Sequence, residues 1–180
     1  MAVVQRVKEK IRPVALLYKF RRSVSEILDQ PFTERIDHQA FRRDQKVLAV
    51  WAAECAERVL PYFEGKYPKD DRPRKAIEAL HDWIKTGEFH MKTIRAASLG
   101  AHAAAKGRKE ADAVFAGHSA GQAVGTAHVA THAMGAALYG IRAVAAHTGN
   151  VSDGLVKERI WQLDRLRKLR ESQQVIEASL

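Results

Sequence analysis

Two histidines, His128 and His132, are the residues whose type and spacing point most directly to chemistry. On a helix, side chains four residues apart share one face, so both imidazoles could bind the same metal ion. The residues between them are valine, alanine and threonine, so the glutamate that makes a zinc-protease helix catalytic is missing. For the third ligand we select His102; the other sources are His118, His38 or a distant carboxylate. Packing of both rings against neighbouring helices, without a metal, is the interpretation that we favour.

The second charged group is the sequence Asp-Asp-Arg-Pro-Arg at residues 70–74. As candidate binding residues we take Asp71, Arg72 and Arg74, because guanidinium groups hold anions and carboxylates through paired hydrogen bonds. In the structural alternative, which we favour, Asp71 caps the following helix and both arginines pair with nearby acids. The acids expected within reach are Glu64, Asp70 or Glu54.

Nucleophilic catalysis finds little support in the sequence. Cys55 falls on an apolar helical stripe, where a small core residue is more common than a reactive thiolate. Ser119 follows His118, but no Gly-x-Ser-x-Gly turn between a strand and a helix surrounds it. We therefore predict no catalytic residue and favour a protein that is not an enzyme.

The histidine pair has to be positioned by an alanine-rich and glycine-rich segment, which we predict as one long central helix over residues 111–147. Seven residues of this segment fall within one arc of about 80° on a helical projection. They are Gly117, Gly121, Gly125, His128, His132, Gly135 and Tyr139. The glycines remove side chains from the arc, so another helix can approach closely. Because charged residues interrupt the apolar run, a buried helix of a soluble bundle is a better interpretation than a membrane span.

Five further helical segments accompany the central one in the prediction. Their apolar residues recur three and four positions apart, as a buried helix face requires, and prolines and glycines separate them. We expect these helices at residues 13–29, 37–60, 71–87, 88–106 and 153–177. No segment alternates apolar and polar residues as a strand does. The predicted fold is all-α, a single-domain helical bundle of about six or seven helices over residues 1–180.

Charge and cysteine content limit the class of protein. Thirty Lys and Arg against 21 Asp and Glu give a formal net charge of +9. A single cysteine excludes a disulfide-framed scaffold, and the first residues lack the apolar core of a signal peptide, so we expect a cytoplasmic protein without a membrane span. Basic residues concentrate before residue 47 and in the last predicted helix. This excess suits an acidic protein partner; nucleic acid is less favoured because acids are interspersed.

Three stretches of the sequence, with a closing fourth, resemble one known family. They are Trp51–Leu60 followed by Phe63 and Glu64, then Asp71–Glu78, then the alanine-rich run from Ala101 through Tyr139, and finally Glu158–Leu163. Together they cover about residues 45–170, and their combination is similar to the prokaryotic family of immunity-five-like, or putative immunity, proteins. Residues 1–45, a basic N-terminal helical segment, depart from this family-like core.

The resemblance implies a small all-helical protein that binds and neutralises a toxin and brings no catalytic residues. Our first hypothesis is a non-enzymatic binding protein whose exposed basic surface blocks an acidic toxin. The second is a metal-dependent helical-bundle enzyme similar to the DinB-like group, with His128, His132 and His102 as ligands. The third is nucleic-acid association through the basic ends. The sequence predicts neither the identity of the toxin nor the oligomeric state.

Overall fold

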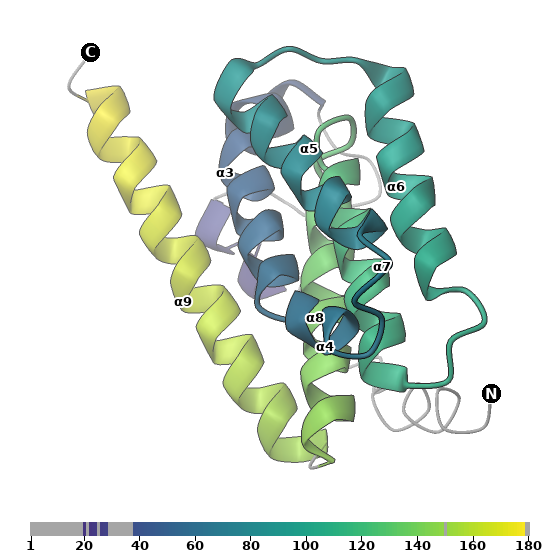
Figure 1. Ribbon diagram of the computed structural model, residues 1–180. Helices are drawn as coiled ribbons and strands as arrows, with labels where there is room; N and C mark the ends of the chain where they lie inside the picture. Colours follow the sequence, from purple (N-terminus) through teal and green to yellow (C-terminus); the bar gives the residue numbers. More distant parts are fainter. Residues whose placement is uncertain (1–19, 21, 25, 29–37, 150, 179–180) are drawn as a thin grey trace.

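The structure, a computed structural model, describes residues 20, 22–24, 26–28, 38–149 and 151–178 of the chain. These ranges contain helices and no strand, so the predicted all-α fold class is confirmed (Figure 1). The seven helices with defined bounds are α3 (His38–Glu57), α4 (Leu60–Glu64), α5 (Arg72–Thr86), α6 (Met91–Ala105), α7 (Ala111–Gly125), α8 (His132–Thr148) and α9 (Val151–Ala178). Of the helix predicted at 13–29, residues 20, 22–24 and 26–28 are described and are helical; the rest of it and most of the basic segment 1–45 lie outside the described residues.

Helix α7 forms the centre of the bundle and packs against α3, α4, α5, α6 and α8. All of its residues are buried except His118 and Gln122, which are half-buried. Alanine and glycine give α7 little side-chain bulk, so five helices can approach it closely. In Figure 1, α6 lies along one edge of the bundle and α9 along the opposite edge.

The single long helix predicted over residues 111–147 is wrong, because the structure divides this segment into α7 and α8. Helix α7 ends at Gly125, α8 begins at His132, and a turn joins them. An unbroken helix of this length would extend about 55 Å, and β-branched residues such as Thr126 and Thr131 weaken helix propensity at the turn. By folding back, α8 packs along α7 and buries a second alanine-rich face.

Other predicted boundaries shift by a few residues. Pro61, expected to close the helix before it, instead lies in the first turn of α4, where its missing N–H costs nothing. Gly87 ends α5 as predicted, with a φ of 73° that glycine adopts without strain. In the described part of the chain, no helix is both long enough and apolar enough to cross a bilayer.

Buried polar contacts hold α9 against α3 and α8. The indole Nε1–H of Trp51 donates to the Gln162 carbonyl at 2.8 Å, and the Gln162 side-chain amide donates to the Ala137 carbonyl at 3.1 Å. Glu158 is 2% exposed and accepts a hydrogen bond from Arg58 at 3.2 Å. Because buried polar groups must be paired, these contacts allow one register of α9 on its neighbours.

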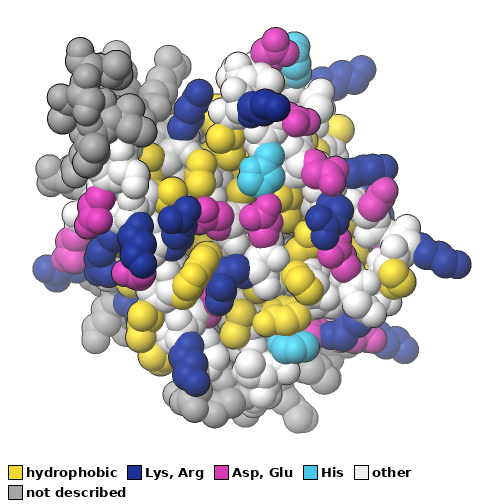
Figure 2. Space-filling view, turned by 60° about the vertical axis from the view of Figure 1, so that its left-hand side comes forward, with side chains coloured by type: hydrophobic (Ala, Val, Ile, Leu, Met, Phe, Trp, Pro, Cys, Tyr) yellow, Lys and Arg dark blue, Asp and Glu magenta, His cyan; other side chains and the backbone are white. Residues whose placement is uncertain are grey.

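On the side of the molecule where α9 lies, acidic and basic side chains are intermingled. Figure 2 brings this side forward and shows Lys and Arg next to Asp and Glu over much of the visible surface. Four of the ion pairs involve residues of α9: Arg58 with Glu158, Arg165 with Glu54, Lys168 with Asp164, and Arg170 with Asp44. The positive charges of Arg165, Lys168 and Arg170 are therefore balanced locally.

Candidate functional site

Helices α6, α7 and α8 bring together four histidines, which we call the histidine row: His102, His118, His128 and His132. His102 and His118 lie with their Nδ1 atoms 2.8 Å apart, so one ring donates a hydrogen bond and the other accepts it. His132, the first residue of α8, donates from Nδ1 to Oε1 of Gln122 at 2.7 Å. The ring centroids of His128 and His132 are 5.1 Å apart.

Glycines of α7 leave the space that two of these rings occupy. A Cβ on Gly121 would lie 2.8 Å from Nε2 of His102, and a Cβ on Gly125 would lie 3.0 Å from Cγ of His132. At Gly117, by contrast, a Cβ would lie 3.1 Å from a Cβ of α6. The predicted close approach of another helix therefore holds at Gly117, whereas the other two glycines admit imidazole rings.

His128 does not lie on the helix that the sequence predicted for it. It belongs to the turn between α7 and α8, so its four-residue spacing from His132 is not a helical spacing. The turn nevertheless places the two rings next to each other, with their planes tilted by 45°. Nδ1 of His128 is buried and has no hydrogen-bond partner among the described residues.

Aromatic and cationic side chains of α8 extend the histidine row. The ring centroid of Tyr139 lies 5.1 Å from that of His118, and the guanidinium of Arg142 lies 5.4 Å from the Tyr139 centroid. Phe115 stacks on the same tyrosine at 6.3 Å. These contacts join α7 and α8 through faces of aromatic rings, which attract a cation such as arginine.

Burial favours the neutral form of three rings of the histidine row. It lowers the pKa of His102 and of His128, because a desolvated imidazole loses stability when it becomes charged. The pKa of His132 is lowered first by burial and then by the charges that His128 and His102 would carry. Residues 91–149 contain Glu110 and Asp112 as their only acids. Neutral rings of this kind pack, donate and accept hydrogen bonds, or bind metal.

The fit of the row to a metal ion depends on its free nitrogen atoms. When Nδ1 of His132 donates to Gln122, its Nε2 keeps the lone pair that a metal ligand needs. In the described ranges, no three His, Cys, Asp or Glu side chains form a group that could hold a metal ion. Metal binding by His102, His128 and His132 stays a prediction, and it would require these rings to rearrange.

The arginines of the second candidate site pair with acids of their own loop region. Arg72 donates to both oxygens of Asp70 at 2.7 Å, and Arg74 donates to the two oxygens of Glu64 at 2.6 and 2.7 Å. Asp70 also accepts from Arg108 at 3.1 Å. The hydrogen bonds from Arg72 lower the pKa of Asp70 to about 2. Two guanidinium groups share this one carboxylate, so the loop keeps a surplus of positive charge.

Asp71 differs in part from its predicted role. It occupies the position before α5, but its side chain makes no capping hydrogen bond and pairs with Lys75 at 2.9 Å instead. Glu54, the third acid expected to pair with the loop arginines, pairs with Arg165 of α9. Binding of a partner by Asp71, Arg72 and Arg74 remains a prediction.

A third polar cluster escaped the sequence analysis. Asp112, at the start of α7, accepts hydrogen bonds from Lys66 and from Nδ1 of His147, the latter at 2.8 Å. Burial raises the pKa of Asp112, but these hydrogen bonds outweigh it and leave the pKa below its usual value. His147 also stacks on Tyr62 with ring centroids 4.0 Å apart. Acids are rare in residues 91–149, and this rarity is the sequence feature that could have drawn attention to Asp112.

The two nucleophile candidates are packed in the interior. Burial raises the pKa of the Cys55 thiol well above its usual value, so the reactive thiolate is disfavoured. The hydroxyl of Ser119 is buried and donates to the Ala136 carbonyl at 2.9 Å. Both side chains have the environment of core residues, which the sequence predicted for Cys55.

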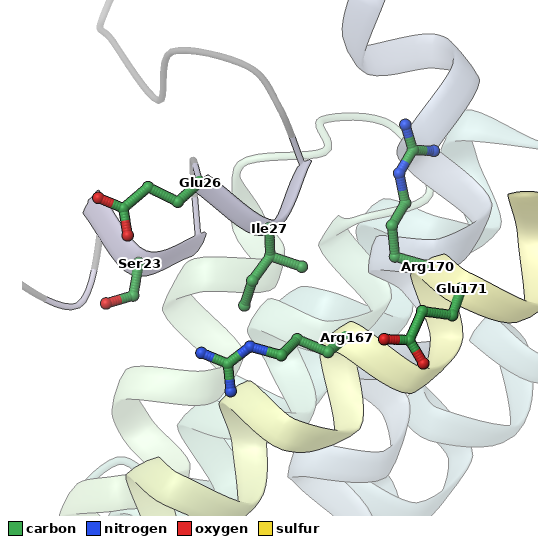
Figure 3. Close-up of a pocket in the computed structure, with 6 residues that line it drawn as sticks. All are labelled: Ser23, Glu26, Ile27, Arg167, Arg170 and Glu171. Atoms are coloured by element: carbon green, nitrogen blue, oxygen red, sulfur yellow. The ribbon is translucent and has the colours of Figure 1, made fainter.

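A pocket of about 330 Å³ lies apart from both predicted sites, between residues 23–27 and α9. Figure 3 shows its lining side chains, with the guanidinium of Arg170 turned away from the others. This guanidinium pairs with Asp44 of α3. The pocket is wide open, and the remaining polar groups around it are Ser23, Glu26, Arg167 and Glu171.

These observations define a class: a small all-helical protein built on a central alanine-rich helix, with paired surface charges and a row of partly buried histidines. Over residues 39–169, the chain matches the model of the family described as Imm-5 like putative immunity protein. The match covers most of the chain, and the protein therefore belongs to this family. No curated protein and no solved structure is significantly similar to the chain.

Proposed function

We propose that this protein binds a toxin and blocks it, without catalysing a reaction. The family match carries the proposal, because residues 39–169 include α4 to α8 and most of α3 and α9. The matched part is thus the whole packed scaffold rather than one motif. A closely packed bundle presents a preformed surface, which lets a binding protein avoid the entropic cost of ordering itself on its partner.

The chemistry of the partner follows from charge. A formal net charge of +9 favours fast association with an acidic surface and disfavours association with a basic one. The toxin is therefore expected to present carboxylates to this protein. The lone cysteine, Cys55, suits a reducing compartment, and we infer that the complex forms in the cytoplasm.

The loop residues Asp71, Arg72 and Arg74 keep a place in this proposal as contacts at the edge of the complex. The side chains of Arg72 and Arg74 are 45% and 53% exposed, although both are paired within the chain. A toxin carboxylate could join these pairs without burying an uncompensated charge. Reversal of Arg74 to glutamate is expected to weaken binding only a few-fold, as is usual for a charge at the rim.

The proposed function predicts that a toxin gene lies beside the gene of this chain, and it is tested by expressing the toxin domain that this neighbouring gene encodes. Cells that make the toxin alone should stop growing, and cells that also make this protein should grow. An unrelated helical protein of similar charge serves as the control for non-specific effects of expression. Growth arrest that persists when the folded protein is present in excess would contradict the proposed function.

A further inference from the structure

Helix α6 has an outward side that no described element covers. Four of its exposed residues recur four positions apart, in the row Met91, Arg95, Leu99 and Ala103. Lys92 and Ala96 lie beside this row, and Thr93 is exposed on another side of the helix. We call this set the outer face of α6: Met91, Lys92, Arg95, Ala96, Leu99 and Ala103. Leu99 is 59% exposed and Met91 is 50% exposed, which places both among the most exposed large apolar side chains of the described chain.

The charges of this face are of one sign. No acid occurs between Glu88 and Glu110, so α6 lies within an acid-free stretch. Lys92 and Arg95 make no ion pair with any residue that the structure describes. On the α9 side, by comparison, Arg165, Lys168 and Arg170 have acidic partners, and acids lie among the bases (Figure 2). The outer face of α6 is thus a place where positive charge is not balanced within the described molecule.

The shape and the polarity of the outer face of α6 suit binding to another protein. Ala96 and Ala103 are small, so a partner's backbone can approach α6 closely along this row. Leu99 lies between them as an apolar centre, and Lys92 and Arg95 lie on the N-terminal side of it. An apolar centre with charged residues around it is the usual organisation of a protein–protein interface.

We propose that the outer face of α6 is the docking surface for the toxin, and that the toxin presents an acidic surface with an apolar centre. This inference rests on the function proposed above. Leu99 and Met91 lose their exposure on docking, and the cations Lys92 and Arg95 receive carboxylates of the toxin. Hydrophobic burial then supplies affinity, while the unbalanced charge selects an acidic partner.

A nucleic acid fits the same face less well. Affinity for a duplex requires several cations placed along the phosphates, whereas the cations of this face are Lys92 and Arg95, which lie within one turn of each other. The face carries no aromatic ring on which a base could stack. The observations therefore favour an acidic protein.

Two pairs of matched variants test the docking surface. The charge pair is Lys92→Glu/Arg95→Glu on α6 against Lys157→Glu/Arg167→Glu on α9, which changes net charge by the same amount. The apolar pair is Leu99→Ala against Ile160→Ala, since Ile160 is 63% exposed on α9. All four variants replace exposed side chains, so all should fold, and circular dichroism checks this.

The measurement is the dissociation constant for a catalytically inactive form of the toxin domain encoded beside this gene, taken by calorimetry at physiological salt. Reversal on α6 should weaken binding about 30-fold or more, and Leu99→Ala should weaken it about tenfold. The α9 variants should bind within about threefold of the parent.

Each other result overturns the inference in a distinguishable way. If the parent protein does not bind the toxin at all, the proposed function fails and the docking surface fails with it. If the parent binds and the α6 variants bind equally well, or the α9 variants lose affinity instead, the function stands and the docking surface is wrong. If the α6 reversal spares toxin binding but abolishes salt-dependent binding to duplex DNA, the face belongs to a nucleic acid.

Discussion

His102 depends on the absence of a side chain at Gly121. The three atoms nearest to a Cβ at this glycine all belong to the His102 ring, at 2.8 to 2.9 Å. The ring has little freedom to move aside, because it is half-buried and its Nδ1 pairs with His118. A glycine that sequence reasoning assigns to helix–helix approach thus has a more specific role, which is to hold an imidazole.

This relation predicts the outcome of a double-mutant cycle. Gly121→Ala should destabilise the protein by about 1–3 kcal/mol through overpacking. In a His102→Ala background the same substitution should cost little, because the clashing ring is gone, so the two changes should be strongly non-additive. The free energy of unfolding in denaturant is the measurement.

Gly100 provides the matched control for this cycle. It lies within α6, and no atom lies within 4 Å of a Cβ built on it. Gly100→Ala should therefore stabilise the helix by about 0.5–1 kcal/mol. Equal and additive effects of Gly121→Ala with and without His102 would show that the ring does not fill the space left by the glycine.

The lowered pKa values of the histidine row predict how stability depends on pH. Histidines in the unfolded chain bind protons as the pH falls through about 6.5, whereas His102, His128 and His132 bind theirs at lower pH in the folded protein. Their contribution is therefore fully present above the unfolded pKa and is lost as the pH falls below it. Denaturant unfolding at about pH 7.5 and about pH 5.5 should show this loss, and His132→Gln should reduce it. A parent protein that gains stability on acidification through this range would refute the assignment.

Residue contacts were predictable from the sequence where the partners are close along the chain. Arg72 with Asp70 and Arg74 with Glu64 are local pairs, and the loop sequence indicates them. The Lys66–Asp112–His147 cluster joins residues 35 and 46 positions apart. It depends on the ends of α7 and α8 meeting, which no local pattern encodes.

At the scale of elements, the helices were predictable where strong end signals flank an apolar period. Helix α5 begins with Pro73 in its first turn and ends at Gly87, and its predicted bounds are confirmed. The break between α7 and α8 was not predictable from periodicity, because the alanine and glycine pattern continues across it. Its cause is the limited size of the bundle, which is a property of the packed molecule.

The packing of α9 on α3 depends on a buried ion pair. The side chains of Arg170 and Asp44 are 9% and 1% exposed, so removing one partner leaves a buried charge without compensation. Asp44→Ala should lower the free energy of unfolding by about 3–5 kcal/mol. Asp44→Leu/Arg170→Met should recover most of the loss, because an apolar pair needs no compensation. If Asp44→Ala and Asp44→Leu/Arg170→Met had equal free energies of unfolding, the two charges would not interact.

Replacing the two histidines at the turn between α7 and α8 distinguishes the packing interpretation from the metal-binding interpretation. We expect His128→Ala/His132→Ala to reduce stability by about 1–3 kcal/mol, since it removes packed rings and leaves Gln122 without its partner. We expect the metal content of the purified, untagged protein to be unaffected, as measured by mass spectrometry. One equivalent of metal in the parent, lost from a folded double variant, would assign the histidines to a metal site.

At the scale of the whole molecule, charge is distributed unevenly between two edges of one bundle. On the α9 edge, Arg165, Lys168 and Arg170 are paired with acids, whereas Lys92 and Arg95 on the α6 edge lie in an acid-free stretch. The sequence indicated the net positive charge and placed its concentration near the two ends of the chain. Which of the described cations are already paired became clear only from the packed helices.

The most direct test of the proposed function is to titrate purified, active toxin with this protein while measuring both toxin activity and complex formation. A blocking protein predicts that activity falls in proportion to the complex and disappears at a fixed stoichiometry. It also predicts that toxin recovered from the complex is active again. Loss of activity at amounts of this protein far below those of the toxin, with the toxin permanently altered, would contradict the account and would identify the protein as an enzyme.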